Sequence, residues 1–129
     1  MKNLSPSSDY FYIVGDEEGG WSSELQFKSA PLATRRRSGM SFAVFADLGS
    51  VNGEPTINYV DSIKDKIDLV WHGGDVSYAD DSFLHVGCLT KFCYEEAYNK
   101  YMNMIQSWAS KVPYMVAPGY VFFPYHFFY

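Results

Sequence analysis

The sequence has 129 residues, of which 47% are hydrophobic, 19% aromatic and 19% charged, and its formal net charge is −5. This composition indicates one modest globular domain rather than two full-sized domains or a disordered chain. The negative charge excludes a general attraction for nucleic acid or anionic membranes, and no stretch reaches the roughly 18 apolar residues that a membrane-spanning helix needs.

The first thirty residues have the pattern of a β-hairpin. Residues 9–15, "DYFYIVG", are dense in aromatic and β-branched residues, and residues 16–20, "DEEGG", have the composition of a turn. Residues 21–27 alternate Trp, Leu and Phe with polar residues. Because an isolated two-stranded ribbon is marginal in water, we expect the hairpin to belong to a larger sheet or to pack against another part of the protein. Residues 28–39, which include three consecutive arginines, are interpreted as a solvated linker.

From residue 40 onward the pattern alternates between strands and helices. Residues 40–47, "MSFAVFAD", form a nearly continuous apolar run, as expected for a strand that is covered on both faces. Pro55 can begin a helix, and residues 68–72, "DLVWH", form a second buried run. Residues 94–110 have the best helical pattern, and a third strand is expected over residues 114–117. The apolar face of this second helix is interpreted as plain core: Tyr98, Tyr101, Met102, Ile105, Trp108 and Ala109.

This order of elements predicts a parallel α/β sheet with right-handed crossovers. In such sheets the loops at the carboxyl ends of the strands form the ligand crevice, and here those loops begin at Asp47, Asp75 and Gly119. Either aspartate alone is better explained as a turn residue that bonds its own backbone. Together with Tyr78, however, the two carboxylates supply hard oxygen donors that suit Fe(III), Mn(II) or Mg(II), and a carboxylate can bridge two ions.

Cys88 and Cys93 have no second cysteine pair and no histidine pattern beside them, so a zinc site of the paired-cysteine kind is not expected. A local disulfide and two free thiols are equally open, and a disulfide would indicate an oxidising compartment. Asn3 begins a triplet that fits the N-glycosylation pattern, but Pro6 follows it closely and such triplets are common by chance.

The segments "FADLGS" and "GGDVSYAD" resemble the first two sequence blocks of the purple acid phosphatases, which belong to the calcineurin-like metallophosphoesterases. The family pattern is DxG, GDxxY, GNHE, VxxH and GHxH. Asp47-Leu48-Gly49 matches the first block, and residues 74–78, "GDVSY", match the second. The tyrosine is the specific part, since most metallophosphoesterases lack it. The resemblance implies that Asp47 and Tyr78 bind Fe(III) and that Asp75 bridges it to a divalent iron, zinc or manganese ion.

The N-terminal residues resemble the last two strands of the fibronectin-III-like domain that precedes the catalytic domain in long members of the family. Leu4 and Tyr10 sit as in a tyrosine corner, in which the hydroxyl caps the strand connection. This resemblance implies four segments in a chain truncated at both ends. They are a remnant of the fibronectin-III-like domain (1–30), a linker (31–39), the N-terminal half of the metallophosphoesterase domain (40–119) and a divergent aromatic tail (120–129).

The third block departs from the family pattern. Gly119 is followed by Tyr120-Val121-Phe122-Phe123 instead of NHE, and neither histidine block follows before Tyr129. The ferric site therefore keeps Asp47, Asp75 and Tyr78, whereas the divalent site keeps only the bridging Asp75, and no complete catalytic set is present. The three histidines are not expected to fill the gap: His126 is an unoriented residue of the tail, His72 is interpreted as a buried or supporting group, and His85 has no family position.

The resemblance implies an acid phosphatase that hydrolyses phosphate monoesters at an Fe(III)–M(II) centre, although these residues alone are expected to be inactive. The alternative is a catalytically inactive chain that acts as a metal-binding or interaction module. A nucleotide-binding domain is less favoured, because neither loop has the glycine spacing of a dinucleotide or P-loop motif. Family members are mostly secreted, vacuolar or lysosomal, yet Met1-Lys2-Asn3 is not followed by the apolar segment of a secretory signal. No nucleic-acid partner is expected, and a homodimer is left open.

Overall fold

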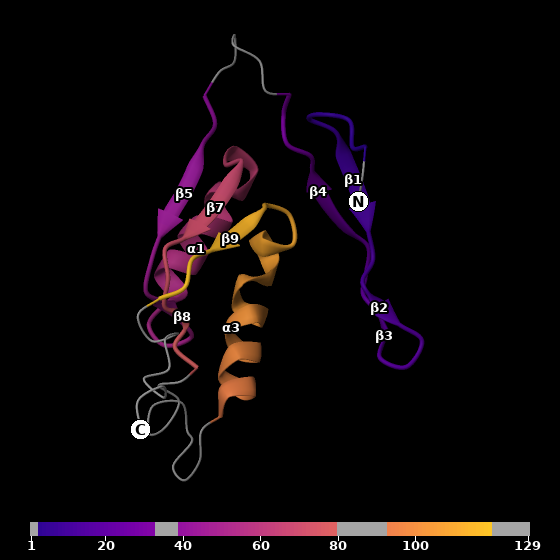
Figure 1. The fold of residues 1–129 in the computed structure, drawn as a ribbon. Helices are drawn as coiled ribbons and strands as arrows, with labels where there is room; N and C mark the ends of the chain where they lie inside the picture. Colours follow the sequence, from indigo (N-terminus) through magenta and orange to yellow (C-terminus); the bar gives the residue numbers. More distant parts are fainter. Residues whose placement is uncertain (1–2, 33–38, 80–92, 120–129) are drawn as a thin grey trace, which may run out of the picture.

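In the computed structural model, which describes residues 3–32, 39–79 and 93–119, an antiparallel ribbon precedes a parallel sheet that packs against two helices (Figure 1). The mixed α/β class and the parallel sheet agree with the sequence analysis. Neither described helix is long and apolar enough to cross a membrane.

The ribbon is the hairpin that the sequence predicts. Strand β1 (Asp9–Tyr12) pairs antiparallel with β4 (Leu25–Lys28), and the short strands β2 (Gly15–Asp16) and β3 (Gly20–Trp21) pair at its far end. Within the β1–β4 pair the rings of Tyr10 and Phe27 stack, with their centroids 5.7 Å apart. The Tyr10 hydroxyl accepts a hydrogen bond of 2.6 Å from the Ser5 backbone N–H, the type of contact expected at a tyrosine corner.

The parallel sheet has the strand order β5-β7-β9, with β5 at Phe42–Phe45, β7 at Leu69–His72 and β9 at Tyr114–Val116. Its register aligns the carboxyl ends of the strands, because Phe45 is opposite His72 and His72 is opposite Val116. Past these ends the chain forms a second parallel pair, β6 (Leu48–Gly49) with β8 (Val76–Ser77). The loops that carry the predicted ligands therefore lie at one edge of the sheet.

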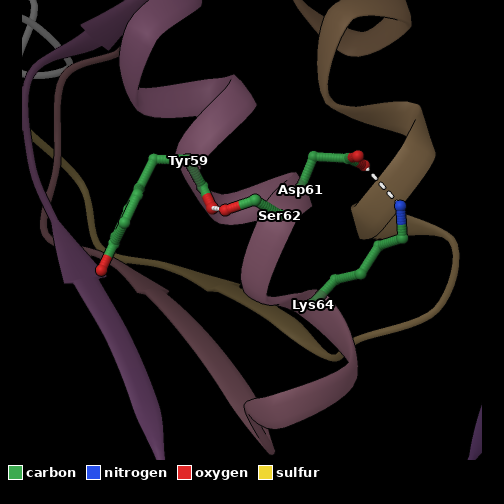
Figure 2. Close-up of polar contacts among 4 residues, drawn as sticks. All are labelled: Tyr59, Asp61, Ser62 and Lys64. Atoms are coloured by element: carbon green, nitrogen blue, oxygen red, sulfur yellow. Dashed lines mark hydrogen bonds and ion pairs between the residues drawn. The ribbon is translucent and has the colours of Figure 1, made fainter.

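The first helix, α1, spans Glu54–Ile63 and has Pro55 in its first turn, where the missing N–H of proline costs nothing. It ends in the short 3₁₀ helix η1 (Lys64–Lys66). Figure 2 shows its last turn, where the Ser62 hydroxyl donates to the Tyr59 carbonyl at 2.7 Å and Lys64 pairs with Asp61 at 2.8 Å. The hydrogen bond from Lys64 lowers the pKa of the Asp61 carboxyl, but a surface pair of this kind adds little stability.

The second helix, α3, spans Tyr94–Ala109 and forms the core together with α1 and one face of the sheet. The assignment of Tyr98 and Met102 to the core is wrong, because they are 43% and 38% exposed. Tyr101, Ile105 and Trp108 of the same helix are fully buried, as predicted from the apolar spacing. They pack on Val70 in the central strand, and Ile57 and Val60 from α1 complete the cluster. The core thus lies directly behind β5 and β7, the strands that are followed by the loops of Asp47 and Asp75.

The opposite face of the sheet is bare in the described part of the chain. Val44 is 71% exposed, Phe42 51%, Met115 51% and Trp71 42%. The expectation that the strand over residues 40–47 is covered on both faces is therefore wrong here. Its physical reason is that α1 and α3 contact each other and share one side of the sheet, so that alternate strand residues face away from both.

The ribbon contacts the α/β part near the end of α3. The Tyr12 hydroxyl donates to the Ser110 carbonyl at 2.7 Å, and a cavity of about 540 Å³ lies between the two parts. Lysines from both sides line this cavity: Lys28, Lys64, Lys66 and Lys111.

Candidate metal centre

The loops after β5 and β7 are tied to each other by backbone hydrogen bonds. The Gly73 N–H donates to the Phe45 carbonyl at 2.7 Å, and the Asp47 N–H donates to the Gly74 carbonyl at 3.1 Å. These bonds extend the parallel pairing past the strand ends. Asp47 and Asp75 consequently project from adjacent, mutually braced loops.

Both loops contain strained backbone. Four of the seven described non-glycine residues with positive φ lie here: Asp47 (φ 56°), Asp75 (φ 52°), Ser77 (φ 67°) and Tyr78 (φ 51°). The left-handed region costs an ordinary residue such as Ser77 or Tyr78 roughly 1–2 kcal/mol, and aspartate less. Such strain persists where the surrounding structure enforces it, and it gathers at functional sites. Both predicted aspartate ligands and the tyrosine share this property.

Tyr78 reaches across from one loop to the other. Its hydroxyl donates a hydrogen bond of 2.7 Å to Oδ1 of Asp47, although the two residues are 31 positions apart in the sequence. A β-carbon at Gly49 would lie 3.1 Å from the Tyr78 ring, so the glycine lets the ring pack closely against this loop. Two of the three predicted ferric ligands therefore have their oxygens in direct contact.

Asp75 has a carboxylate oxygen that is buried and without a hydrogen-bond partner in the described residues. Asp75 as a whole is half-buried, so this one shielded oxygen carries a desolvation cost. The backbone of Gly119 covers it so closely that a β-carbon at residue 119 would lie 1.8 Å from Asp75 Oδ1. A cation beside Asp75 would remove the cost, and oxygen donors of this kind fit a hard metal ion.

The donor set is small. Among the residues that the structure describes, no group of three or more His, Cys, Asp or Glu side chains could hold a metal ion. With Tyr78, the two carboxylates become a set of three side chains that offer oxygen donors. The arrangement suits a hard cation that binds oxygen donors better than it suits a metal that requires nitrogen or sulfur ligands.

His72 lies beneath these loops and is fully buried. Its Nε2 accepts a hydrogen bond of 3.4 Å from the Leu48 N–H, and its Nδ1 lies 2.6 Å from the Tyr114 hydroxyl and 3.2 Å from that of Tyr101. The two hydroxyls are 2.9 Å apart. Burial lowers the pKa of His72, against smaller opposing effects of the Gly74 backbone and the charges of both aspartates. The interpretation of His72 as a buried supporting group agrees with this geometry.

Sequence reasoning missed the polar role of the two tyrosines. Tyr101 was expected to be plain core and Tyr114 a strand residue, yet their hydroxyls complete the surroundings of His72. Burial is the main effect that raises the pKa of each phenol, so both are protonated at neutral pH. The available signal was the choice of tyrosine over phenylalanine at two core positions.

The other predicted residues lie away from this centre. Cys93 is disulfide-bonded, while Cys88, the other cysteine of the sequence, lies outside the described residues, so their pairing stays a prediction. Asn3 is exposed at the start of the described chain. His85 and the tail residues 120–129, including His126, lie outside the described residues.

Comparisons with known proteins identify acid phosphatases as relatives of this chain. The chain is 32% identical to a protein named "Probable inactive purple acid phosphatase 1" from Arabidopsis thaliana, over 92% of this chain and 20% of that protein. It is 30% identical to "Acid phosphatase type 7" from Homo sapiens, over 92% of this chain and 24% of that protein. Among solved structures, the purple acid phosphatase PPD1 from yellow lupin (Lupinus luteus) seeds has a TM-score of 0.71 at 27% identity, covering 92% of this chain and 22% of that one.

No protein-family model matches the sequence. The chain spans about a fifth of the length of the first curated relatives that it matches.

Proposed function

Because the chain belongs to the purple acid phosphatase family, we propose that it carries the ferric half of a dinuclear metal site for the hydrolysis of phosphate monoesters. Asp47 and Tyr78 are the ferric ligands, and Asp75 is the carboxylate that bridges to a divalent iron, zinc or manganese ion. The observation that carries the proposal is the bond of 2.7 Å between the Tyr78 hydroxyl and Asp47 Oδ1.

That bond also identifies the proton that would have to leave when a metal ion binds: the phenol proton of Tyr78. In the metal-free chain the phenol proton lies between Tyr78 and Asp47, because a hydroxyl donates and a carboxylate accepts. Tyr78 as phenolate and Asp47 would hold a ferric ion, with the phenol proton released to solvent. The shielded oxygen of Asp75 would gain a cationic partner at the same time. When bound, the two metals would polarise the phosphate ester and neutralise the charge that develops during phosphoryl transfer.

The same proposal includes a domain division. Residues 1–30 are strands of a fibronectin-III-like domain, 31–39 a linker, 40–119 the N-terminal half of the metallophosphoesterase domain and 120–129 a divergent tail. The tyrosine-corner bond from Ser5 to Tyr10 supports the first of these, and the parallel order β5-β7-β9 supports the third. A secreted, vacuolar or lysosomal location is part of the proposal, since a disulfide at Cys93 fits an oxidising compartment.

A second candidate is a catalytically inactive metal-binding or interaction module. Two observations favour it: Tyr120 stands where the family pattern has the asparagine ligand, and the Arabidopsis relative described above is named as probably inactive. Sequencing of transcripts beyond the Gly119 codon separates the candidates. Transcripts that encode NHE and the two histidine blocks support the phosphatase, whereas only transcripts that encode residues 120–129 support the module.

Metal analysis tests the shared claim about the site. The 129-residue chain is equilibrated with Fe(III) nitrilotriacetate and then with Zn(II), and its metal content and hydrolysis of p-nitrophenyl phosphate are measured. We expect about one Fe(III) per chain, little zinc and no turnover, because the described carboxylates support only one side of the centre. The matched variant Asp47→Asn is expected to lose the iron. Equal iron content in the variant and the parent chain would contradict the assignment.

A further inference from the structure

His72 differs from the other fully buried side chains in that both of its ring nitrogens have polar partners. It stands at the carboxyl end of the central strand β7, directly before the loop of Asp75. The Phe45 ring packs against it, with the centroids 4.9 Å apart. The ring is therefore held on its apolar side as well as at its nitrogens, and it has little freedom to turn.

We assign the tautomer of His72 from its contact with the Leu48 N–H. A backbone N–H can only donate, so Nε2, which meets the Leu48 N–H, is the unprotonated acceptor. We therefore place the proton on Nδ1, which donates to the Tyr114 hydroxyl at 2.6 Å. The Tyr101 hydroxyl bonds that of Tyr114 and closes the network. Burial lowers the pKa of His72 and raises those of both tyrosines, which keeps all three groups neutral at neutral pH.

The amide that His72 accepts from is the one that follows Asp47. The Asp47 N–H is held by the Gly74 carbonyl and the Leu48 N–H by His72, so the backbone is fixed on both sides of Asp47. Asp47 adopts a left-handed conformation with φ 56°, which aspartate tolerates better than most non-glycine residues and which these two hydrogen bonds hold in place. The Leu48 side chain is 4% exposed and anchors the same peptide in the core.

We propose that His72 is the positioning residue of the Asp47 loop, and that the Tyr114 hydroxyl fixes the tautomer with which it acts. His72 acts through the Leu48 amide and does not touch the metal. The inference rests on the ferric role of Asp47 proposed above. Partners that orient metal ligands from behind typically change metal affinity 10- to 100-fold when they are removed.

The first test uses the metal-free chain. Nitrogen NMR of the His72 imidazole reports which nitrogen carries the proton, and hydrogen exchange reports the protection of the Leu48 amide. We expect a protonated Nδ1, a protected Leu48 amide and loss of that protection in His72→Asn. His72→Gln places an amide oxygen near the position of Nε2 and is expected to restore the protection. A protonated Nε2, or equal Leu48 exchange in the parent chain and His72→Asn, would overturn the inference whatever the metal does.

The second test is Fe(III) affinity, with Tyr114→Phe set against Tyr12→Phe as a matched control. Each variant loses one bonded tyrosine hydroxyl, but the hydroxyl of Tyr12 bonds the carbonyl of Ser110, the C-cap of α3, and not His72. We expect Tyr114→Phe and His72→Asn to weaken Fe(III) binding about 10-fold, with His72→Gln and Tyr12→Phe within about threefold of the parent chain. If Tyr114→Phe and Tyr12→Phe bind Fe(III) with equal affinity, the Tyr114 hydroxyl has a merely structural role and the inference is overturned. Failure of the parent chain to bind Fe(III) would refute the proposed function, and the metal-free test would then decide on His72 alone.

Discussion

At the scale of single residues, the carboxylate of Asp75 and the backbone of Gly119 leave no room for an added methyl group. A β-carbon at residue 119 would lie 1.8 Å from Asp75 Oδ1, so the carboxylate or the backbone would have to move to accept it. Gly119→Ala should therefore displace the Asp75 carboxylate and weaken Fe(III) binding by at least about 10-fold. Gly39→Ala is the matched control, because its β-carbon meets open space. Comparable iron affinities for the two variants, measured by equilibrium dialysis, would contradict the close packing of Gly119 on Asp75.

A second residue-scale prediction concerns acid stability. The folded pKa of His72 is depressed below its unfolded value of 6.5, so between these two pKa values the unfolded chain binds more protons. Its contribution to the free energy of unfolding is complete above pH 6.5 and is lost as the pH falls through the folded pKa. Urea unfolding at pH 7 and pH 5 should show a steeper loss for the parent chain than for His72→Gln. Parallel losses in both proteins would mean that His72 does not titrate in this way.

Residue-scale function was only partly predictable from the sequence. Asp47, Asp75 and Tyr78 stand in recognisable blocks, and their positions at strand ends follow from the alternation of elements. The bond between Tyr78 and Asp47 does not follow from it, because it depends on positive φ values at Asp47 and Tyr78. The hydrogen-bond network around His72 could not be predicted from the sequence either, since Tyr101 and Tyr114 satisfy the same apolar pattern as phenylalanine would.

At the scale of elements, α3 contributes three of the eight buried residues of the described core cluster, more than any other element. Ile105 is fully buried in that helix, whereas Met102 is 38% exposed. Ile105→Ala should lower the free energy of unfolding by about 2–5 kcal/mol through lost burial and the cavity that it leaves. Met102→Ala should change it by about 0.5 kcal/mol or less. Similar values from denaturant unfolding of both variants would contradict the assignment of α3 to the core.

The elements after residue 40 were predictable because hydrophobic period and turn residues agree there. The helix at 94–110 and the strands of the parallel sheet appear close to their expected bounds. The bare face of the sheet was not predictable, since an apolar run gives no information on which side the helices pack. Val44 and Trp71 satisfy the pattern of a doubly covered strand, but both are exposed because α1 and α3 share one side.

At the scale of the whole molecule, the bare face of the described sheet is a solvent-exposed apolar surface. Val44, Phe42, Trp71 and Met115 lie on it, and β5 is an edge strand of the described sheet. Exposed apolar faces and open strand edges favour self-association. We therefore expect the 129-residue chain to associate as its concentration rises, and Val44→Lys to reduce the association.

Sedimentation velocity over a range of concentrations measures that effect. Val51→Lys is the matched control, because Val51 is 52% exposed but lies in the loop before α1 rather than on the sheet. The sheet substitution should shift the distribution toward the monomer, and the loop substitution should leave it unchanged. If both variants behave like the parent chain, the bare face does not drive association.

The central claim is that Tyr78 and Asp47 form a ferric site, and visible spectroscopy of the iron-loaded chain tests it most directly. Titration of the chain with Fe(III) nitrilotriacetate should produce a visible absorption band from charge transfer between tyrosinate and iron. Resonance Raman excitation in that band should enhance phenolate ring modes. Tyr78→Phe should abolish both signals, whereas Tyr59→Phe, which removes an exposed phenol on α1, should retain them. A band of equal strength in Tyr78→Phe, or no band in the parent chain when iron is bound, would contradict the account.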